Sequence, residues 1–114
     1  MTTSTKTTTA SNSLSHYVVV RDDLSPGLQL AYAVHAAGES VCERVPAGTR
    51  AVVLGCKDEA SLRELASHLV ATATSHEVII EHDEAYSIGV CPLHGQAPDC
   101  LRSLELAGRP SPSP

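Results

Sequence analysis

Three segments of the chain contain residues that could take part in catalysis or in ligand binding. His35 lies in a helical pattern of small residues, where it is either a packed histidine, as its position favours, or an acid, a base or a polar contact facing a cleft. Ser25-Pro26-Gly27 is typical of a helix start, whose free amides favour an anion, although any capped helix has them. The acidic run 81–84 follows a strand pattern and predicts either a general base or a solvated turn.

The patterns of most other sites are missing from the sequence. Cys91 and His94 have half of a zinc spacing, but no second pair matches it, and the sequence places no histidine beside Cys56 for cysteine catalysis. A phosphate-binding Gly-x-x-x-x-Gly-Lys loop and a Gly-x-Ser-x-Gly elbow are both absent. We therefore expect neither a metal nor a cofactor.

Length and charge narrow the class of protein. The 114 residues suit one domain, expected over 14–107, between a Ser/Thr-rich tail at 1–13 and a Pro/Ser-rich tail at 108–114 that are too polar to fold. The net charge of −5 disfavours nonspecific binding to nucleic acid, which needs Lys and Arg. The sequence has no apolar run of about eighteen residues and no signal peptide, which predicts a cytoplasmic protein with no membrane span and with free thiols.

The apolar pattern predicts alternating strands and helices that would position these groups. Tyr17–Val20 has no charged residue, as is typical of a strand buried on both faces. Ser25 is expected to cap a first helix that fades near 44–46, and Asp58 a second helix. Three further strands and a short helix are expected at 51–54, 77–81, 86–91 (stopped by Pro92) and 99–104, respectively.

The order βαβαββα predicts one α/β domain, in which each of the two long helices should bury an apolar stripe. The sheet is then mixed and four-stranded, and helices flank it. In the first helix the residues at helical spacing are Leu28, Ala31, Val34, His35, Gly38 and Val41. In the second they are Leu62, Leu65, Ala66, Leu69, Val70 and Ala73.

Several short motifs of the chain resemble the type-2 peptidyl-tRNA hydrolase family, especially its short branch. The matching residues begin with Val18-Val19-Val20-Arg21, Asp23-Leu24, Gly27, Ala31 and His35-Ala36. They continue through Val52-Val53-Leu54, Asp58-Glu59, Leu62, Leu65, Glu81, Asp83, Ser87, Val90-Cys91-Pro92 and Leu104-Glu105-Leu106. The resemblance implies an enzyme that hydrolyses the ester between a peptide and the terminal ribose of tRNA, without a metal, and that often forms dimers.

The resemblance also implies where a site would lie. The family's Lys and Gln, one turn apart on the first helix, correspond to Leu28 and Tyr32, and its Asp and hydroxyl residue correspond to Glu81 and Ser87. Glu81 would then orient or deprotonate water, while Ser87 and the hydroxyl of Tyr32 would bind the ribose or the ester oxygen. The expected substrate-binding residues are Arg21, Gly27, Tyr32 and His35.

Two hypotheses on function stay open at the level of the sequence. The first is an ester hydrolase acting on peptidyl- or aminoacyl-tRNA, with a homodimer as its expected assembly. The second is a noncatalytic binding module on the same fold, which binds a tRNA end, a protein partner or a small ligand. Leu28 and Tyr32 favour the second hypothesis, because they make a polar site more apolar.

Overall fold

The computed structural model describes residues 14–41 and 43–108 and has the α/β fold that the sequence predicts. The predicted tail at 1–13, the tail predicted at 108–114 except for Gly108, and the thiol of Cys42 lie outside the described residues. The elements are β1 (Ser15–Arg21), α2 (Pro26–Glu39), β2 (Arg50–Cys56), α3 (Glu59–Ala71), β3 (His76–Glu81), β4 (Glu84–Leu93), α4 (Asp99–Arg102) and β5 (Glu105–Leu106). None of these helices is long and apolar enough to cross a membrane.

The sheet is mixed, but it has five strands in the order β3-β4-β1-β2-β5 rather than four. β1 and β2 are parallel and are joined through α2, while β1–β4, β3–β4 and β2–β5 are antiparallel. The extra strand, β5, is only two residues long and pairs with Leu54 and Gly55 of β2. A segment that short has no alternation of its own, so its pattern could not predict a strand.

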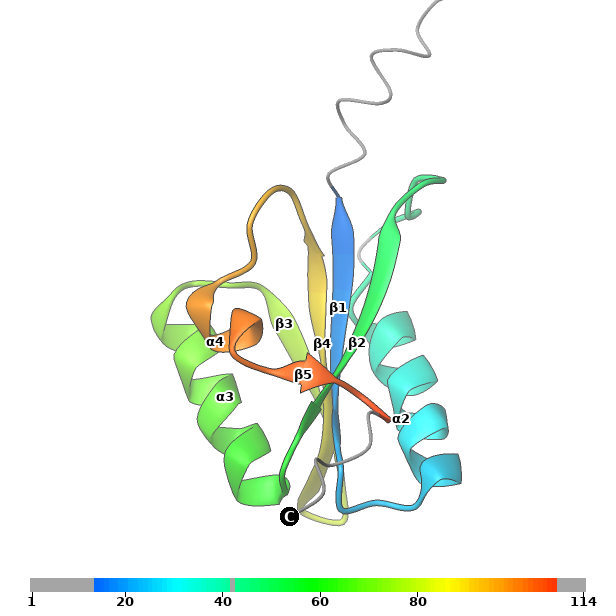
Figure 1. Cartoon of the computed structure of the whole chain (residues 1–114), viewed down its shortest axis with the longest axis vertical. Coiled ribbons are helices and arrows are strands. Elements are labelled where there is room, and N and C mark those ends of the chain that lie inside the picture. Colours follow the sequence, from blue (N-terminus) through cyan, green and yellow to red (C-terminus); the bar gives the residue numbers. More distant parts are fainter. Residues whose placement is uncertain (1–13, 42, 109–114) are drawn as a thin grey trace, which may run out of the picture.

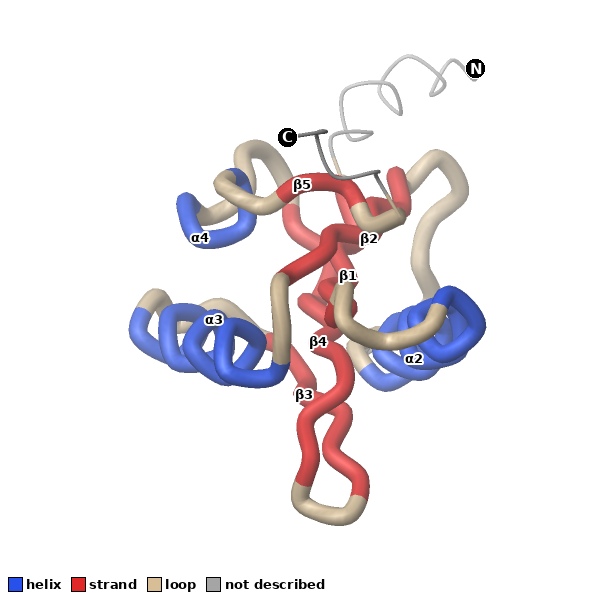
Figure 2. The backbone as a smooth tube through the Cα atoms, turned by 60° about the horizontal axis from the view of Figure 1, so that its bottom comes forward, coloured by secondary structure: helices blue, strands red, loops and turns tan. Residues whose placement is uncertain are grey.

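The two long helices cover opposite faces of the sheet, with β1 and β4 between them (Figures 1 and 2). Successive side chains of a strand point to opposite faces, and β1 supplies apolar residues to both. Val19 packs in the core with the leucines of α3, while Val18 and Val20 pack in a smaller core with Ala36 of α2. The prediction of a strand buried on both faces is confirmed, since all three valines are at most 4% exposed.

The second predicted helix forms as expected. Asp58 caps α3 through its side chain, which accepts a hydrogen bond from the amide of Ser61 at 3.0 Å. Leu62, Leu65 and Leu69 are buried against the sheet. The stripe ends there, because Val70 is 69% exposed.

The predicted buried stripe of α2 is wrong. Leu28 and Val34 are 47% and 73% exposed, and Ala36 is the buried residue of the helix. Gly89 of β4 explains the choice of face, because a Cβ there would collide with the carbonyl oxygen of Ala36 and with the Ser40 side chain. The helix therefore lies so close to the sheet that only small side chains fit between them. It also ends earlier than predicted, at Glu39, with Ser40 as its C-cap.

The fourth strand continues past Pro92, which was expected to end it. The pairing between β1 and β4 is irregular here, since Ser15 pairs with Leu93 while Tyr17 pairs with Val90. Proline has no amide hydrogen and is tolerated in strands at such irregularities. The strand therefore runs to Leu93.

Candidate functional site

Most of the predicted site residues meet at one end of the sheet. There β1 and β3 end and β4 begins, and α2 and α3 start beside them, at the bottom of Figure 1. Arg21 is the last residue of β1, Glu81 is the last of β3, and Tyr32 and His35 come from α2. Ligands of α/β sheets often bind at the carboxyl ends of strands, which agrees with this location.

The turn between β3 and β4 fixes two carboxylates opposite each other. Glu81 pairs directly with Glu84 across the hairpin, and only His82 and Asp83 separate them. Both turn residues have positive φ, 51° and 64°, as a two-residue type I′ turn requires. The predicted turn at 82–85 is therefore shorter in the structure, and Glu84 belongs to β4.

Arg21 is buried, and all three nitrogens of its guanidinium donate hydrogen bonds within the protein. It donates to both oxygens of Asp23 at 2.9 Å, to Glu84 at 2.5 Å and to the carbonyl oxygen of Ala85 at 3.0 Å. The Arg21 cation lowers the pKa of both carboxyls, that of Asp23 and that of Glu84, through these hydrogen bonds. The side chain is only 8% exposed, so its burial argues against the predicted contact between Arg21 and a substrate. Its role in the structure is to organise the site.

A stack of planar groups extends from Arg21 to the surface of α2. The guanidinium carbon of Arg21 lies over the ring of Tyr86, 5.6 Å from its centroid. The rings of Tyr86 and Tyr32 stack with centroids 4.4 Å apart and planes 7° apart. His35 continues the series at 6.4 Å and 19° from Tyr32, at the exposed end. Because His35 is exposed, the expectation that it packs against the sheet is wrong.

The hydroxyl of Tyr32 joins the stack to Glu81. It donates a hydrogen bond to Glu81 Oε1 at 2.7 Å, which connects helix α2 to the end of β3. This hydrogen bond to a carboxylate is the main cause that raises the pKa of Tyr32 to about 12, since the neutral phenol is the donor. No hydrogen bond to Glu81 Oε2 is formed within the described part of the chain. The lone pairs of that oxygen are therefore not used by any described residue.

Ser87 does not face the site. Its side chain is completely buried, and its hydroxyl donates to the backbone carbonyl oxygen of Tyr32 at 2.9 Å. The predicted catalytic contact of Ser87 with a substrate is therefore corrected to a structural one. The hydroxyl fixes α2 to β4 where the two approach closely, and so holds the backbone of Tyr32.

Gly27 lies in the first turn of α2, and nothing else lies within 4 Å of the position that a Cβ would take. Ser25 caps the helix as predicted, with its hydroxyl accepting from the amide of Leu28 at 3.4 Å. Asp22 and Asp23 precede this helix start, which makes its surroundings acidic. The open approach agrees with the predicted role of Gly27, but the neighbouring charges do not favour an anion there.

The site has an excess of carboxylates. Arg63 of α3 is paired with Glu59 at 3.0 Å and also donates to the carbonyl oxygen of Asp83 at 2.8 Å, so its charge is partly used. Asp22, Glu81 and Asp83 form no ion pair with any residue that the structure describes. A ligand of this site is therefore not attracted chiefly by positive charge.

No protein-family model matches the chain, and no curated protein matches it either. The geometry of the site and the resemblance to the peptidyl-tRNA hydrolase family are therefore the basis for a proposal on function. A continuous series of contacts runs from Arg21 through Tyr86 and Tyr32 to Glu81.

Tyr86 and Glu84 complete the site, and the sequence pattern did not single out Tyr86. The pairing of β3 with β4 shifts here: Ile79 pairs with Ser87 and Ile80 pairs with Ala85, which leaves Tyr86 as an extra residue. Such a bulge changes the side to which a residue points. Plain alternation would put Tyr86 on the same face as the buried Ile88, which packs in the core with α3.

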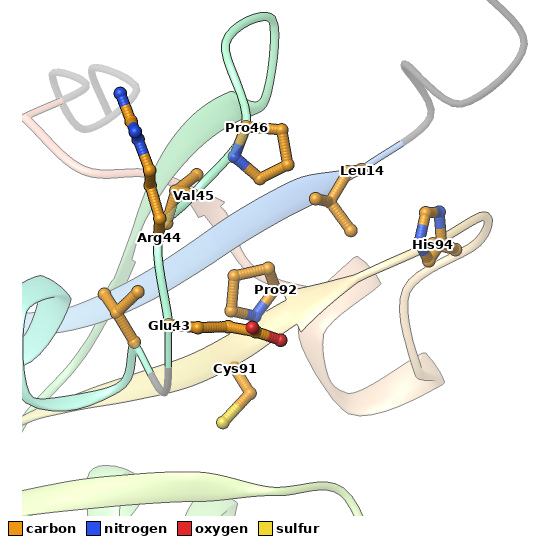
Figure 3. Close-up of a pocket in the computed structure, with 9 residues that line it drawn as sticks. Leu14, Glu43, Arg44, Val45, Pro46, Cys91, Pro92 and His94 are labelled. Atoms are coloured by element: carbon orange, nitrogen blue, oxygen red, sulfur yellow. The ribbon is translucent and has the colours of Figure 1, made fainter. Parts of the chain in front are cut away.

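A hollow of about 400 Å³ lies at the other end of β1 and is separate from this site (Figure 3). Its walls include Leu14, the loop at 43–46 and the end of β4 near Cys91 and His94. In no part of the described chain do three or more His, Cys, Asp or Glu side chains gather so that they could hold a metal ion. The half zinc spacing at 91–94 is thus not completed by other described residues.

Proposed function

We propose that the chain is a cytoplasmic ester hydrolase of the peptidyl-tRNA hydrolase type, which releases an acyl or peptidyl group from the terminal ribose of tRNA. The observation that carries the proposal is the 2.7 Å hydrogen bond from Tyr32 to Glu81. The resemblance assigns both residues to a site, although they lie 49 positions apart in the chain. Their meeting at the carboxyl end of a strand supports a common function.

The reaction follows from the two oxygens of Glu81. Oε1 is held by the hydroxyl of Tyr32, which orients the carboxylate, and Oε2 accepts a proton from water. The oxygen of that water attacks the ester carbonyl carbon. When the tetrahedral intermediate collapses, the bond to the ribose oxygen breaks and the proton passes from Glu81 to that oxygen. The products are a free acid and a ribose hydroxyl, and no cofactor takes part.

The charge of the site restricts how tRNA would be held. With Arg21 buried and carboxylates in excess, few phosphate contacts are available at this end of the sheet. The exposed ring of His35, next to Tyr32, offers a flat surface for the terminal base. We therefore expect the enzyme to hold the acylated end of the RNA and little of the duplex.

The test is the release of peptide from N-blocked aminoacyl-tRNA. Replacing Glu81 by Gln keeps its shape but removes the base, so kcat should fall about 10²–10⁴-fold, as general-base catalysis contributes. The matched control is Glu64→Gln on α3, whose side chain is 77% exposed, and it should leave the rate unchanged. An unchanged rate in E81Q, with an active wild type, would contradict the role of Glu81.

A second candidate, binding without catalysis, is favoured by the burial of Ser87. Its hydroxyl is used inside the protein, so the site has one polar group fewer than the resemblance implies. A filter-binding assay separates the two candidates. A wild type that retains N-acetylaminoacyl-tRNA on the filter but releases nothing above the blank would establish a binding module and end the hydrolase proposal.

A further inference from the structure

We infer that Tyr86 is a positioning residue of the site. It is held in place by Glu84 and buried Arg21, and its ring keeps Tyr32 oriented so that the Tyr32 hydroxyl binds Glu81. The inference rests on the proposed function, which makes Glu81 the base. The inference goes beyond the proposed function because it assigns a role to Tyr86, which the resemblance does not include. Three features of the structure support it, which are the anchor of Tyr86, its stack on Tyr32 and a bulge in β4.

The first feature is the anchor of Tyr86. Its hydroxyl donates to Glu84 Oε1 at 3.0 Å, and Glu84 Oε2 accepts from Arg21 at 2.5 Å. Arg21 is itself held by Asp23 and by the backbone of Ala85. The tyrosine is thus fixed at its hydroxyl end to a buried cation, and its ring also lies against that cation.

The second feature is the stack between the two tyrosines. With centroids 4.4 Å apart and planes only 7° apart, the ring of Tyr86 restricts the rotation of Tyr32 about its side-chain bonds. The ring of His35 restricts Tyr32 less, because His35 is exposed and its ring centroid is 6.4 Å from that of Tyr32. Tyr86 is therefore the neighbour that sets the direction of the Tyr32 hydroxyl.

The third feature is the bulge that aims Tyr86 at α2. Because Tyr86 is the extra residue between the Ile79–Ser87 and Ile80–Ala85 pairs, it leaves the face that alternation would give it. Bulges are common beside active sites, where they redirect a side chain. Ser87, the next residue, binds the carbonyl oxygen of Tyr32, so consecutive residues of β4 hold both the ring and the backbone of Tyr32.

The experiment compares Tyr86→Leu, which removes the stacked ring, with Tyr86→Phe, which keeps it. In Y86L, kcat for N-blocked aminoacyl-tRNA should fall about ten-fold with KM nearly unchanged, since one aromatic pair is worth about 1.4 kcal/mol, which is one factor of ten in rate. In Y86F the stacked ring remains and only the hydrogen bond to Glu84 is lost, so kcat should fall by clearly less than in Y86L, again with KM nearly unchanged. Equal losses in the two variants would overturn the inference.

A spectroscopic measurement tests the positioning without any hydrolysis. The chain has three tyrosines and no tryptophan, so Tyr17→Phe combined with either Tyr86 variant leaves Tyr32 as the single phenol. Its tyrosinate absorbance then reports whether the Tyr32 hydroxyl still lies on Glu81, which raises its pKa to about 12. We expect a raised pKa in Y17F/Y86F and a lower one in Y17F/Y86L, with circular dichroism confirming the fold at each pH.

The two measurements distinguish a failure of the proposed function from a failure of the inference about Tyr86. If no variant and no wild type hydrolyses the ester, the proposed function falls, but the titration still decides whether Tyr86 positions Tyr32. If Y86L leaves the pKa of Tyr32 as high as Y86F does, the inference is overturned even in an active enzyme. Should Y86L not fold, Tyr86→Thr removes the ring with a residue that favours strands, and the same outcomes apply.

Discussion

At the scale of single residues, the site is organised by one buried cation. Arg21 is only 8% exposed, yet it satisfies two carboxylates and a backbone carbonyl at once. A guanidinium can do this because its donors form a planar fork, which matches the two oxygens of Asp23 while a further nitrogen reaches Glu84. A lysine at this position has a single ammonium and cannot reproduce the arrangement.

We therefore expect Arg21→Lys to destabilise the protein despite the conserved charge. The loss should be about 2 kcal/mol, below the range for fully buried pairs because both partner carboxylates are partly exposed to water. Urea denaturation followed by circular dichroism measures it. Arg102→Lys on α4 is the matched control, since Arg102 is 45% exposed, and it should change stability little. Equal stability of the two variants would contradict the organising role of Arg21.

At the scale of the elements, the close contact between α2 and β4 determines where Tyr32 lies. Gly89 and Ala36 meet where any larger side chain would collide, and the Ser87 hydroxyl binds the helix backbone beside them. The helix therefore turns its small residues inward and leaves Leu30 and Val34 at least 70% exposed. The face that carries Tyr32 is fixed by this choice.

Two glycine substitutions test this contact. Gly89→Ala should destabilise the protein by about 1–3 kcal/mol, the range for overpacking, because the added methyl meets the Ala36 carbonyl oxygen and Ser40. Gly38→Ala, on the same helix α2, has open space around its Cβ and should stabilise by about 0.5–1 kcal/mol through helix propensity. Thermal unfolding of both variants checks the signs, and a G89A variant as stable as the wild type would show that α2 can move away from β4.

At the scale of the whole molecule, the two ends of the sheet differ in chemistry. The end with Arg21 and Glu81 is acidic, while the other end of β1 holds His16, which is buried and 2.8 Å from the hydroxyl of Ser40. Ser40 gives its own hydroxyl proton to the carbonyl oxygen of Ala36, so His16 Nε2 donates to Ser40. Burial lowers the pKa of His16 below its ordinary value of 6.5, because the charged ring loses its water.

The stability of the protein should therefore fall in mild acid. A histidine whose folded pKa is lowered contributes stability that is present above the unfolded value of about 6.5 and is lost as the pH falls toward the folded pKa. The carboxyls of Asp23 and Glu84 have pKa values below their ordinary 3.8 and 4.5, so the stability that they contribute is lost only when the pH falls below these values. Urea midpoints from pH 8 to 5 should decline in the wild type and stay flat in His16→Gln, whereas His68→Gln, an exposed control, should behave like the wild type.

The sequence by itself determined the α/β class, the helix caps at Ser25 and Asp58, and the doubly buried β1. These features depend on local hydrogen bonds and on apolar periodicity, both of which are written in consecutive residues. It also pointed to Tyr32 and Glu81, which the fold brings into contact.

Only the tertiary structure decided which side chains face the site. One extra residue in β4 reverses the side to which Tyr86 points, and a pattern of alternation cannot contain a bulge before the pairing is known. The burial of Ser87 also depends on tertiary packing, because it follows from how closely α2 approaches β4. The burial of Arg21 follows from the carboxylates that surround the end of β1. Polarity along the chain says what a residue can bind, but the neighbours that occupy its atoms come from distant segments.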